Sequence, residues 1–165
     1  MPFRIRQAAH GEWDAADAVA ARAFGQYGLE HPEWIGAMRE TPPMRWIGEN
    51  AELLVAISGT AVIGAVGYVA PGRPRREFFP AEWAILRMLS VPPEQRGLGL
   101  GRALVEACIG CARRDDVATL GLYTSPVMKV AVPLYRRMGF EHQGAAPPDH
   151  GMPCDIYALA MDKVR

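Results

Sequence analysis

A glycine-rich segment that separates an apolar stretch from a helical stretch restricts the possible folds of this chain more than any other feature. Residues 82–91 are apolar at nearly every position, which is typical of a strand buried on both faces of a sheet. Two prolines end that strand, and Gly97, Gly99 and Gly101 precede a helix that we expect to reach about residue 113. This order predicts a buried strand, a tight loop and a helix as the central unit of the fold.

The remaining hydrophobic pattern predicts a sheet flanked by helices. Alternating side chains indicate a first strand over 3–8, and two apolar runs joined by a short turn indicate a hairpin over 53–57 and 61–69. Further expected elements are helices over 14–24, about 33–39 (ended by Pro42 and Pro43) and 128–138, and strands over 119–124, 140–143 and 155–160. We therefore expect residues 1–165 to form a single domain of the α/β (α+β) class. Its central sheet should be mixed and mostly antiparallel, with one parallel crossover.

The charge balance argues against two classes of partner. Lys plus Arg and Asp plus Glu each total 18, so the formal net charge is zero at pH 7. Such a chain has no strong field for nucleic acid or for an anionic membrane, and neither is expected as a partner. There is no uninterrupted apolar stretch of about 18 residues, and the start lacks a signal-peptide pattern. These features predict a cytoplasmic protein.

The cysteines do not indicate a metal site. Cys108 and Cys111 form a Cys-x-x-Cys pair, but a zinc site would need a second pair or closely spaced histidines. The pair lies well inside the expected helix and shares an apolar face with Leu104, so we expect core packing and no metal.

The glycine-rich loop has the properties of a phosphate cradle. A helix N-terminus carries unpaired N–H groups and partial positive charge, and glycines let the backbone approach an anion closely. The loop lacks the Lys-Ser/Thr of a nucleotide P-loop and the spacing of a dinucleotide fingerprint. From these residues alone, a phosphate ligand and a tight turn without a ligand both remain possible.

Two segments resemble the Gcn5-related N-acetyltransferase (GNAT) family. The family's acetyl-CoA motif, Gln/Arg-x-x-Gly-x-Gly/Ala, is similar to the segment containing Arg96, Gly99 and Gly101. A second segment, from Leu134 to Phe140, resembles the family's Leu-Tyr-x-x-x-Gly-Phe and follows at the family's spacing. The resemblance covers roughly residue 53 to the C-terminus. It implies a GNAT-like acyl-CoA N-acyltransferase fold in which two strands splay apart beside a bulge.

The resemblance also implies the cosubstrates and the residues that bind them. The donor would be acetyl-CoA, and the acceptor would be a small-molecule or peptide amine; a homodimer is common in such proteins. An N–H near the bulge could stabilise the oxyanion of the tetrahedral intermediate. The expected cofactor contacts are Leu89, Ser90 and Val91 along the pantetheine arm, and Arg96, Gly97, Leu98, Gly99, Leu100, Gly101 and Arg102 at the pyrophosphate.

Catalysis would need a proton donor for the departing thiolate and a proton acceptor for the amine. Tyr135 matches the family's tyrosine acid, and Glu82 lies near where some members carry a catalytic glutamate, although water could serve instead. Two departures from the pattern are Met128, where many members have Asn, and Pro133, which should either kink the helix or lie in its first turn.

Several alternatives remain open at this stage. A non-catalytic acyl-CoA-binding module and a transferase for a longer acyl group would carry the same donor motif. Arg87, inside the apolar strand, should reach a carboxylate of the protein or a cleft where it could bind an acidic group of the acceptor. Aromatic residues before the central strand could line a pocket for an apolar or cationic amine, or could pack helices and loops: Tyr27, Trp34, Trp46, Phe78, Phe79 and Trp83.

Overall fold

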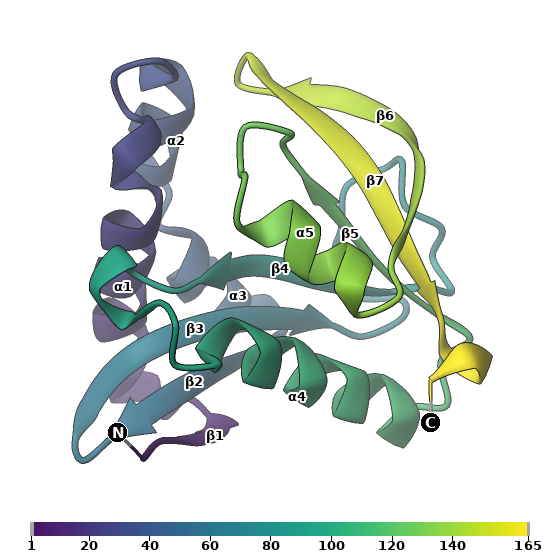
Figure 1. Cartoon of the computed structure of the whole chain (residues 1–165), viewed down its shortest axis with the longest axis horizontal. Coiled ribbons are helices and arrows are strands. Elements are labelled where there is room, and N and C mark those ends of the chain that lie inside the picture. Colours follow the sequence, from purple (N-terminus) through teal and green to yellow (C-terminus); the bar gives the residue numbers. More distant parts are fainter. Residues whose placement is uncertain (1, 165) are drawn as a thin grey trace.

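The computed structural model describes residues 2–164 and contains one seven-stranded sheet (Figure 1). The strand order is β1-β2-β3-β4-β5-β7-β6, and every neighbouring pair is antiparallel except β4 and β5, which are parallel. The strands are β1 (Arg4–Gln7), β2 (Glu52–Ser58), β3 (Ala61–Val69), β4 (Ala84–Ser90), β5 (Thr119–Thr124), β6 (Glu141–Asp149) and β7 (Met152–Ala160). The expected mixed, mostly antiparallel sheet is confirmed.

Helices cover both faces of this sheet and produce two main cores. One core joins the sheet to α4 (Leu100–Arg114) and α5 (Ala131–Arg137). The other joins it to α1 (Trp13–Phe24), α2 (Pro32–Glu40) and α3 (Pro43–Asn50). Short 3-10 helices lie at His10–Glu12, Gly25–Tyr27, Pro93–Gln95 and Met161–Lys163. Cys108 is fully buried in the first core, as expected, and the described residues contain no group of three potential metal ligands.

The parallel pair β4 and β5 is joined only at its amino-terminal end. Ala84 pairs with Leu120 and Ile85 with Gly121, and no register pair follows although both strands continue. The two strands therefore diverge toward their carboxyl ends, and the backbone edges beyond these pairs face a gap rather than each other. This gap is the geometric basis of the cavity described below.

A β-bulge lies on β4 beyond its last pair with β5. The register between β3 and β4 shifts between Ala65 and Gly67, so that one residue of β3 lies opposite Met88 and Leu89. Met88 has a φ of 59°, a left-handed value that is unusual for a non-glycine residue. Bulges of this kind bend a strand and redirect its side chains, and they are common beside active sites.

The structure differs from the sequence-based expectations at several places. Strands β6 and β7 are longer than the strands expected over 140–143 and 155–160. Pro42 and Pro43 end α2 as expected, but Pro43 also begins α3, which the pattern did not predict. The helix expected over 128–138 is shorter and begins at Ala131, so Pro133 lies in its first turn, where a missing N–H costs little. The central strand begins at Ala84, which leaves Glu82 in the preceding turn rather than at the start of the strand.

The start of α3 is held by a carboxylate from another helix. Asp17 of α1 accepts hydrogen bonds from the backbone N–H groups of Met44 (2.8 Å) and Arg45 (3.1 Å). These are orphan donors of the first turn, and an N-cap normally comes from the residue directly before the helix. Because the cap lies far upstream in the sequence, no local signal indicated this helix.

The cap gives a stability prediction. Asp17→Ala should lower the free energy of unfolding by about 1–2 kcal/mol, because two first-turn N–H groups lose their acceptor. Urea unfolding followed by circular dichroism measures the change. Asp14→Ala is the matched control, since Asp14 only forms an exposed ion pair with Arg45 and its loss should have a much smaller effect. Equal unfolding free energies for the two variants would contradict the capping role.

Candidate functional site

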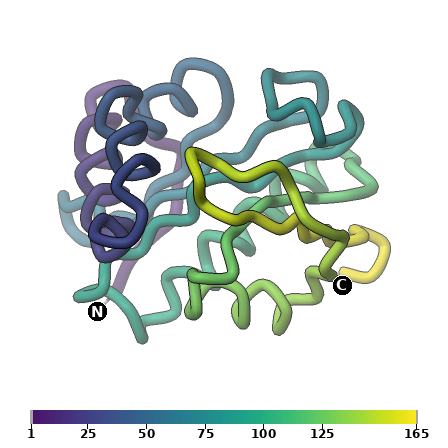
Figure 2. Tube along the Cα trace, turned by 90° about the horizontal axis from the view of Figure 1, so that it is seen from above, coloured from purple at the N-terminus to yellow at the C-terminus, as the bar shows by residue number. Residues whose placement is uncertain are grey.

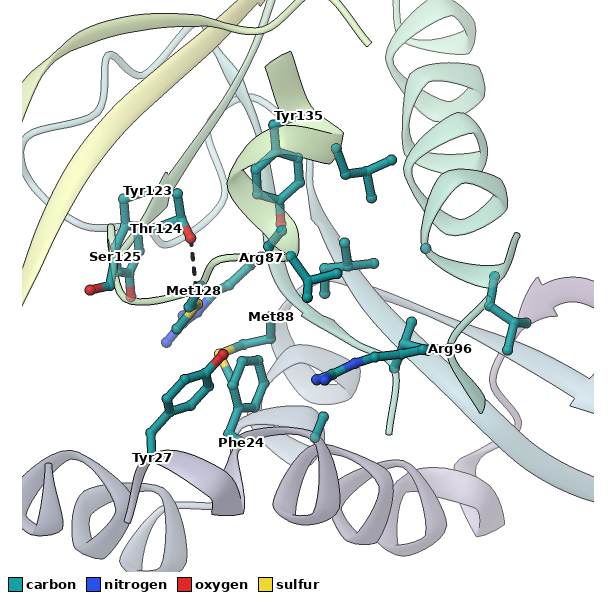
Figure 3. A pocket seen from close by; sticks show the side chains of 18 of the residues that line it. Phe24, Tyr27, Arg87, Met88, Arg96, Tyr123, Thr124, Ser125, Met128 and Tyr135 are labelled. Carbon is teal, nitrogen blue, oxygen red and sulfur yellow. Dashed lines mark hydrogen bonds between the residues drawn. The ribbon is translucent and has the colours of Figure 1, made fainter. Parts of the chain in front are cut away.

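A cavity of about 390 Å³ occupies the gap between β4 and β5. Its walls come from the ends of these strands, the N-terminus of α4, α5, the α1–α2 segment and the β6–β7 hairpin. Figure 3 shows Tyr135 and Tyr27 entering the cavity from opposite sides, with Arg96 reaching in from the loop before α4. The cavity thus joins parts of the chain that lie far apart in the sequence.

One end of the cavity has the geometry of an anion site. Gly97 and Gly99 have φ values of 84° and 79°, and the space where a Cβ would lie at either position is open within 4 Å. Gly99 is the N-cap residue of the fifteen-residue helix α4, so the unpaired N–H groups of the first turn lie directly behind it. Bare backbone, helix dipole and nearby guanidinium groups together fit a pyrophosphate.

Most of the predicted cofactor residues meet at this cavity. Those that line it are Leu89, Val91, Arg96, Gly97, Gly99, Leu100, Gly101 and Arg102. Ser90 and Leu98 do not line it: Ser90 is fully buried and its hydroxyl donates to the Met88 carbonyl at 2.8 Å, whereas Leu98 is 41% exposed. Arg137 of α5 also lines the cavity. Cofactor contacts by these residues stay predictions.

Tyr135 is placed where its hydroxyl can act in the cavity. It is 4% exposed, its ring lies 5.7 Å from that of Phe140, and its hydroxyl points into the cavity (Figure 3). Burial raises the pKa of Tyr135 well above its ordinary value, because the charged phenolate would lose its hydration. The phenol is therefore protonated at neutral pH, which is the form that a proton donor must have.

Met128 lines the cavity between β5 and α5, at the position where the family often has Asn. The Thr124 hydroxyl donates a weak hydrogen bond to its sulfur at 3.5 Å, drawn as the dashed line in Figure 3. This thioether offers no N–H donor to a ligand, so an amide contact at this place is lost.

The predicted base does not join these residues. Glu82 is exposed in the turn before β4, at the end of the strand opposite the bulge, and it does not line the cavity. The geometry therefore gives no support to a role for Glu82 in proton transfer.

Among the described residues that line the cavity, Asp149 is the one carboxylate. It lies at the tip of the β6–β7 hairpin, which approaches α2 in Figure 2. Trp34 of α2 donates its indole N–H to Asp149 at 3.1 Å, and Arg76 forms an ion pair with it at 3.0 Å. Sequence reasoning missed Asp149 because only the long hairpin brings this residue, far along the chain, to the helices at its start.

The half of the cavity near Asp149 is mostly aromatic and sulfur-containing. The rings of Phe24 and Trp34 meet edge to face with their centres 5.4 Å apart, and Tyr27 lies beside Trp34. Met88, Met128 and Met152 contribute the remaining apolar surface. Two of the aromatic residues expected to line a pocket, Tyr27 and Trp34, do so. Phe78, Phe79 and Trp83 instead pack against Tyr123 and the sheet.

Comparison with known proteins gives a consistent family. A family profile described as "Acetyltransferase (GNAT) domain" matches residues 49–142. Mycothiol acetyltransferase from Cellulomonas flavigena is 33% identical over 152 residues, which cover 85% of this chain and 42% of that protein. The chain spans about two fifths of the length of the curated relatives that it resembles.

Two solved structures show the same fold. PaiA N-acetyltransferase from Thermoplasma acidophilum, in complex with coenzyme A, has a TM-score of 0.77 and 16% identity over 97% of this chain and 99% of that chain. The acetyltransferase yncA from Salmonella typhimurium, described as putative and bound to acetyl-CoA, has a TM-score of 0.68 and 18% identity over 98% of this chain and 95% of that chain.

The anion site gives a binding prediction. Gly99→Asp should weaken binding of coenzyme A by well over tenfold, because a side chain at φ 79° is strained and its carboxylate would face the pyrophosphate. Isothermal titration calorimetry measures the affinity. Gly110→Asp, on the exposed side of the same helix, adds the same charge away from the loop and should leave the affinity nearly unchanged. A change of less than about twofold for Gly99→Asp, near 0.4 kcal/mol, would contradict a phosphate site in this loop.

Proposed function

The chain belongs to the GNAT family of acetyltransferases, and we propose that it transfers an acetyl group from acetyl-CoA to the amine of a small molecule or peptide. The observation that carries the proposal is the single cavity that extends from the bare N-terminus of α4 to the hydroxyl of Tyr135. It offers a phosphate site, an open strand edge and a proton donor along one path.

The donor half of the cavity fits acetyl-CoA. The pyrophosphate would lie on the N–H groups of α4 with Arg96 beside it, and the pantetheine arm would follow the open edge of β4 at Leu89 and Val91. An arm that pairs with strand backbone in this way would occupy the gap that β5 leaves. This orientation directs the thioester toward the bulge and Tyr135.

The reaction is direct attack of the neutral amine on the thioester carbonyl carbon. A C–N bond forms, and the carbonyl oxygen becomes an oxyanion that a backbone N–H near Leu89 can stabilise. The C–S bond then breaks, and the departing thiolate takes the proton of the Tyr135 hydroxyl. The nitrogen that attacked now carries one proton too many, and the proton that it releases restores the Tyr135 phenol. Alignment of the two reactants within one cavity supplies much of the rate enhancement.

The amine must lose a proton before or during attack, and Asp149 is our candidate to receive it. This carboxylate lines the half of the cavity that contains Phe24, Trp34 and the methionines, which we call the acceptor half. Trp34 and Arg76 fix the orientation of the carboxylate. A non-catalytic acyl-CoA-binding module is the alternative to an enzyme. Such a module would need neither a phenol directed into the cavity nor a carboxylate that lines the same cavity.

The proton-donor role of Tyr135 leads to a kinetic prediction. Tyr135→Phe should lower kcat by roughly 10²-fold, the low end for general acid catalysis because a thiolate already leaves readily, and should barely change the affinity for acetyl-CoA. Thiol release measures kcat, and calorimetry in EDTA measures affinity. Tyr157→Phe is the matched control: Tyr157 is also buried and is hydrogen-bonded to Arg136, but it does not line the cavity.

An unchanged kcat in Tyr135→Phe, with chemistry limiting the rate, would remove Tyr135 from the mechanism. Failure of the folded wild type to bind acetyl-CoA would overturn the function itself.

The two candidate proton acceptors can be compared directly. Asp149→Asn should lower kcat/KM for the amine by at least roughly tenfold, because the amide keeps the shape but cannot accept the proton. Glu82→Gln should leave kcat/KM unchanged, since Glu82 lies outside the cavity. Activity that depends on Glu82 and not on Asp149 would reverse this assignment.

A further inference from the structure

Arg87 is a cation inside the central strand β4, and it lines the cavity. Its neighbour Leu86 belongs to the core beneath α4, so the alternation of side chains along β4 directs Arg87 to the opposite face. There its guanidinium carbon lies 4.7 Å from the centre of the Trp46 ring of α3, and the residue lines the cavity. Leu100, the first residue of α4, lies in the core on the other side of the sheet, together with Leu86.

The guanidinium of Arg87 has unused hydrogen-bonding capacity. Its Nε is closed off from solvent and has no hydrogen-bond partner in the described part of the chain. No ion pair with Asp or Glu among residues 2–164 compensates its charge, which corrects one of the two sequence-based expectations. Trp46 covers one face of the planar group by a cation–π contact, and such a contact leaves the N–H edge available.

The surroundings of Arg87 favour an anion that arrives with the ligand. A cation held in a partly buried site without a counter-ion is costly, and the planar fork of Arg matches a carboxylate with two parallel hydrogen bonds. The other charged groups near this wall are Asp149 and Arg76, and they already pair with each other. Tyr123 lies beside them, and burial raises the pKa of Tyr123, so its hydroxyl is a neutral donor.

We propose that the acceptor is a free amino acid with an apolar side chain, whose carboxylate is bound by Arg87. The inference rests on the proposed function and specifies its acceptor. The carboxylate would pair with Arg87, the side chain would lie among Phe24, Trp34 and the methionines, and the amine would lie between Asp149 and the thioester. A peptide N-terminus has an amide in place of that carboxylate and would leave Arg87 without a counter-ion.

Matched acceptors test the proposal without any mutation. Phenylalanine, leucine and methionine are each compared with their own amide in the thiol-release assay. The wild type should prefer each amino acid over its amide in kcat/KM by roughly tenfold or more, the loss expected when a charged hydrogen-bonded pair is removed. Calorimetric titration of the same pairs into the protein, both alone and in complex with coenzyme A, gives a second readout that needs no turnover.

Variants of Arg87 identify the residue responsible. In Arg87→Gln the ratio of amino acid to amide should fall to near one, while affinity for acetyl-CoA stays unchanged; differences in amine basicity cancel in this comparison of ratios. Arg87→Lys keeps the charge without the fork and should retain part of the preference, which provides a test if the Gln variant does not fold. A wild type that uses amides equally well, or a ratio unchanged in both variants, would overturn the proposal.

Loss of acetyl-CoA binding or of thiol release with every amine would instead mark failure of the acetyltransferase function, and the calorimetric comparison would still decide the carboxylate preference.

Discussion

The incomplete hydrogen-bond ladder between β4 and β5 is the constraint on which the rest of the structure depends. Two residue pairs hold these parallel strands together, and beyond them the sheet is open. Unpaired backbone inside a protein is costly, so an open edge of this kind is stable only when another group completes it. The bulge at Met88 lies on the part of β4 that has already left β5, and α4 and α5 cover one side of the gap (Figure 1). The break in the sheet thus creates both the space and the hydrogen-bonding groups of the cavity.

A second set of contacts connects segments of the cavity wall that are far apart in the sequence. Asp149 of the β6–β7 hairpin accepts from Trp34 of α2 and pairs with Arg76 of the loop before β4. That loop is itself organised by Arg75, which donates to the carbonyls of Pro80 and Ala70. Three segments that are distant in the sequence therefore share one small polar network. The acceptor wall is rigid only as far as these few hydrogen bonds are maintained.

The sequence predicted the strand, loop and helices around the glycine-rich segment because their signals are local. The apolar run of β4, the glycines before α4 and the tyrosine of α5 each lie within a short stretch whose spacing reports directly on structure. The acceptor half depends on contacts between distant segments. The cap that Asp17 provides for α3, the long hairpin that carries Asp149, and the turn that removes Glu82 from β4 could not be read from neighbouring residues. Tertiary contacts, rather than propensity, decide these features.

The two halves of the cavity differ in how much of their lining the family profile covers. The family profile matches residues 49–142, which contain the splayed strands, the glycine-rich loop and Tyr135. Tyr27, Trp34 and Asp149 lie outside that range, on segments that enclose the other half of the same cavity. In the proposed function, recognition of acetyl-CoA would use mainly backbone atoms, which tolerate many side-chain replacements, whereas recognition of the acceptor would use side chains. Drift in the outer segments can therefore produce new acceptor preferences in descendants that inherit the donor half intact.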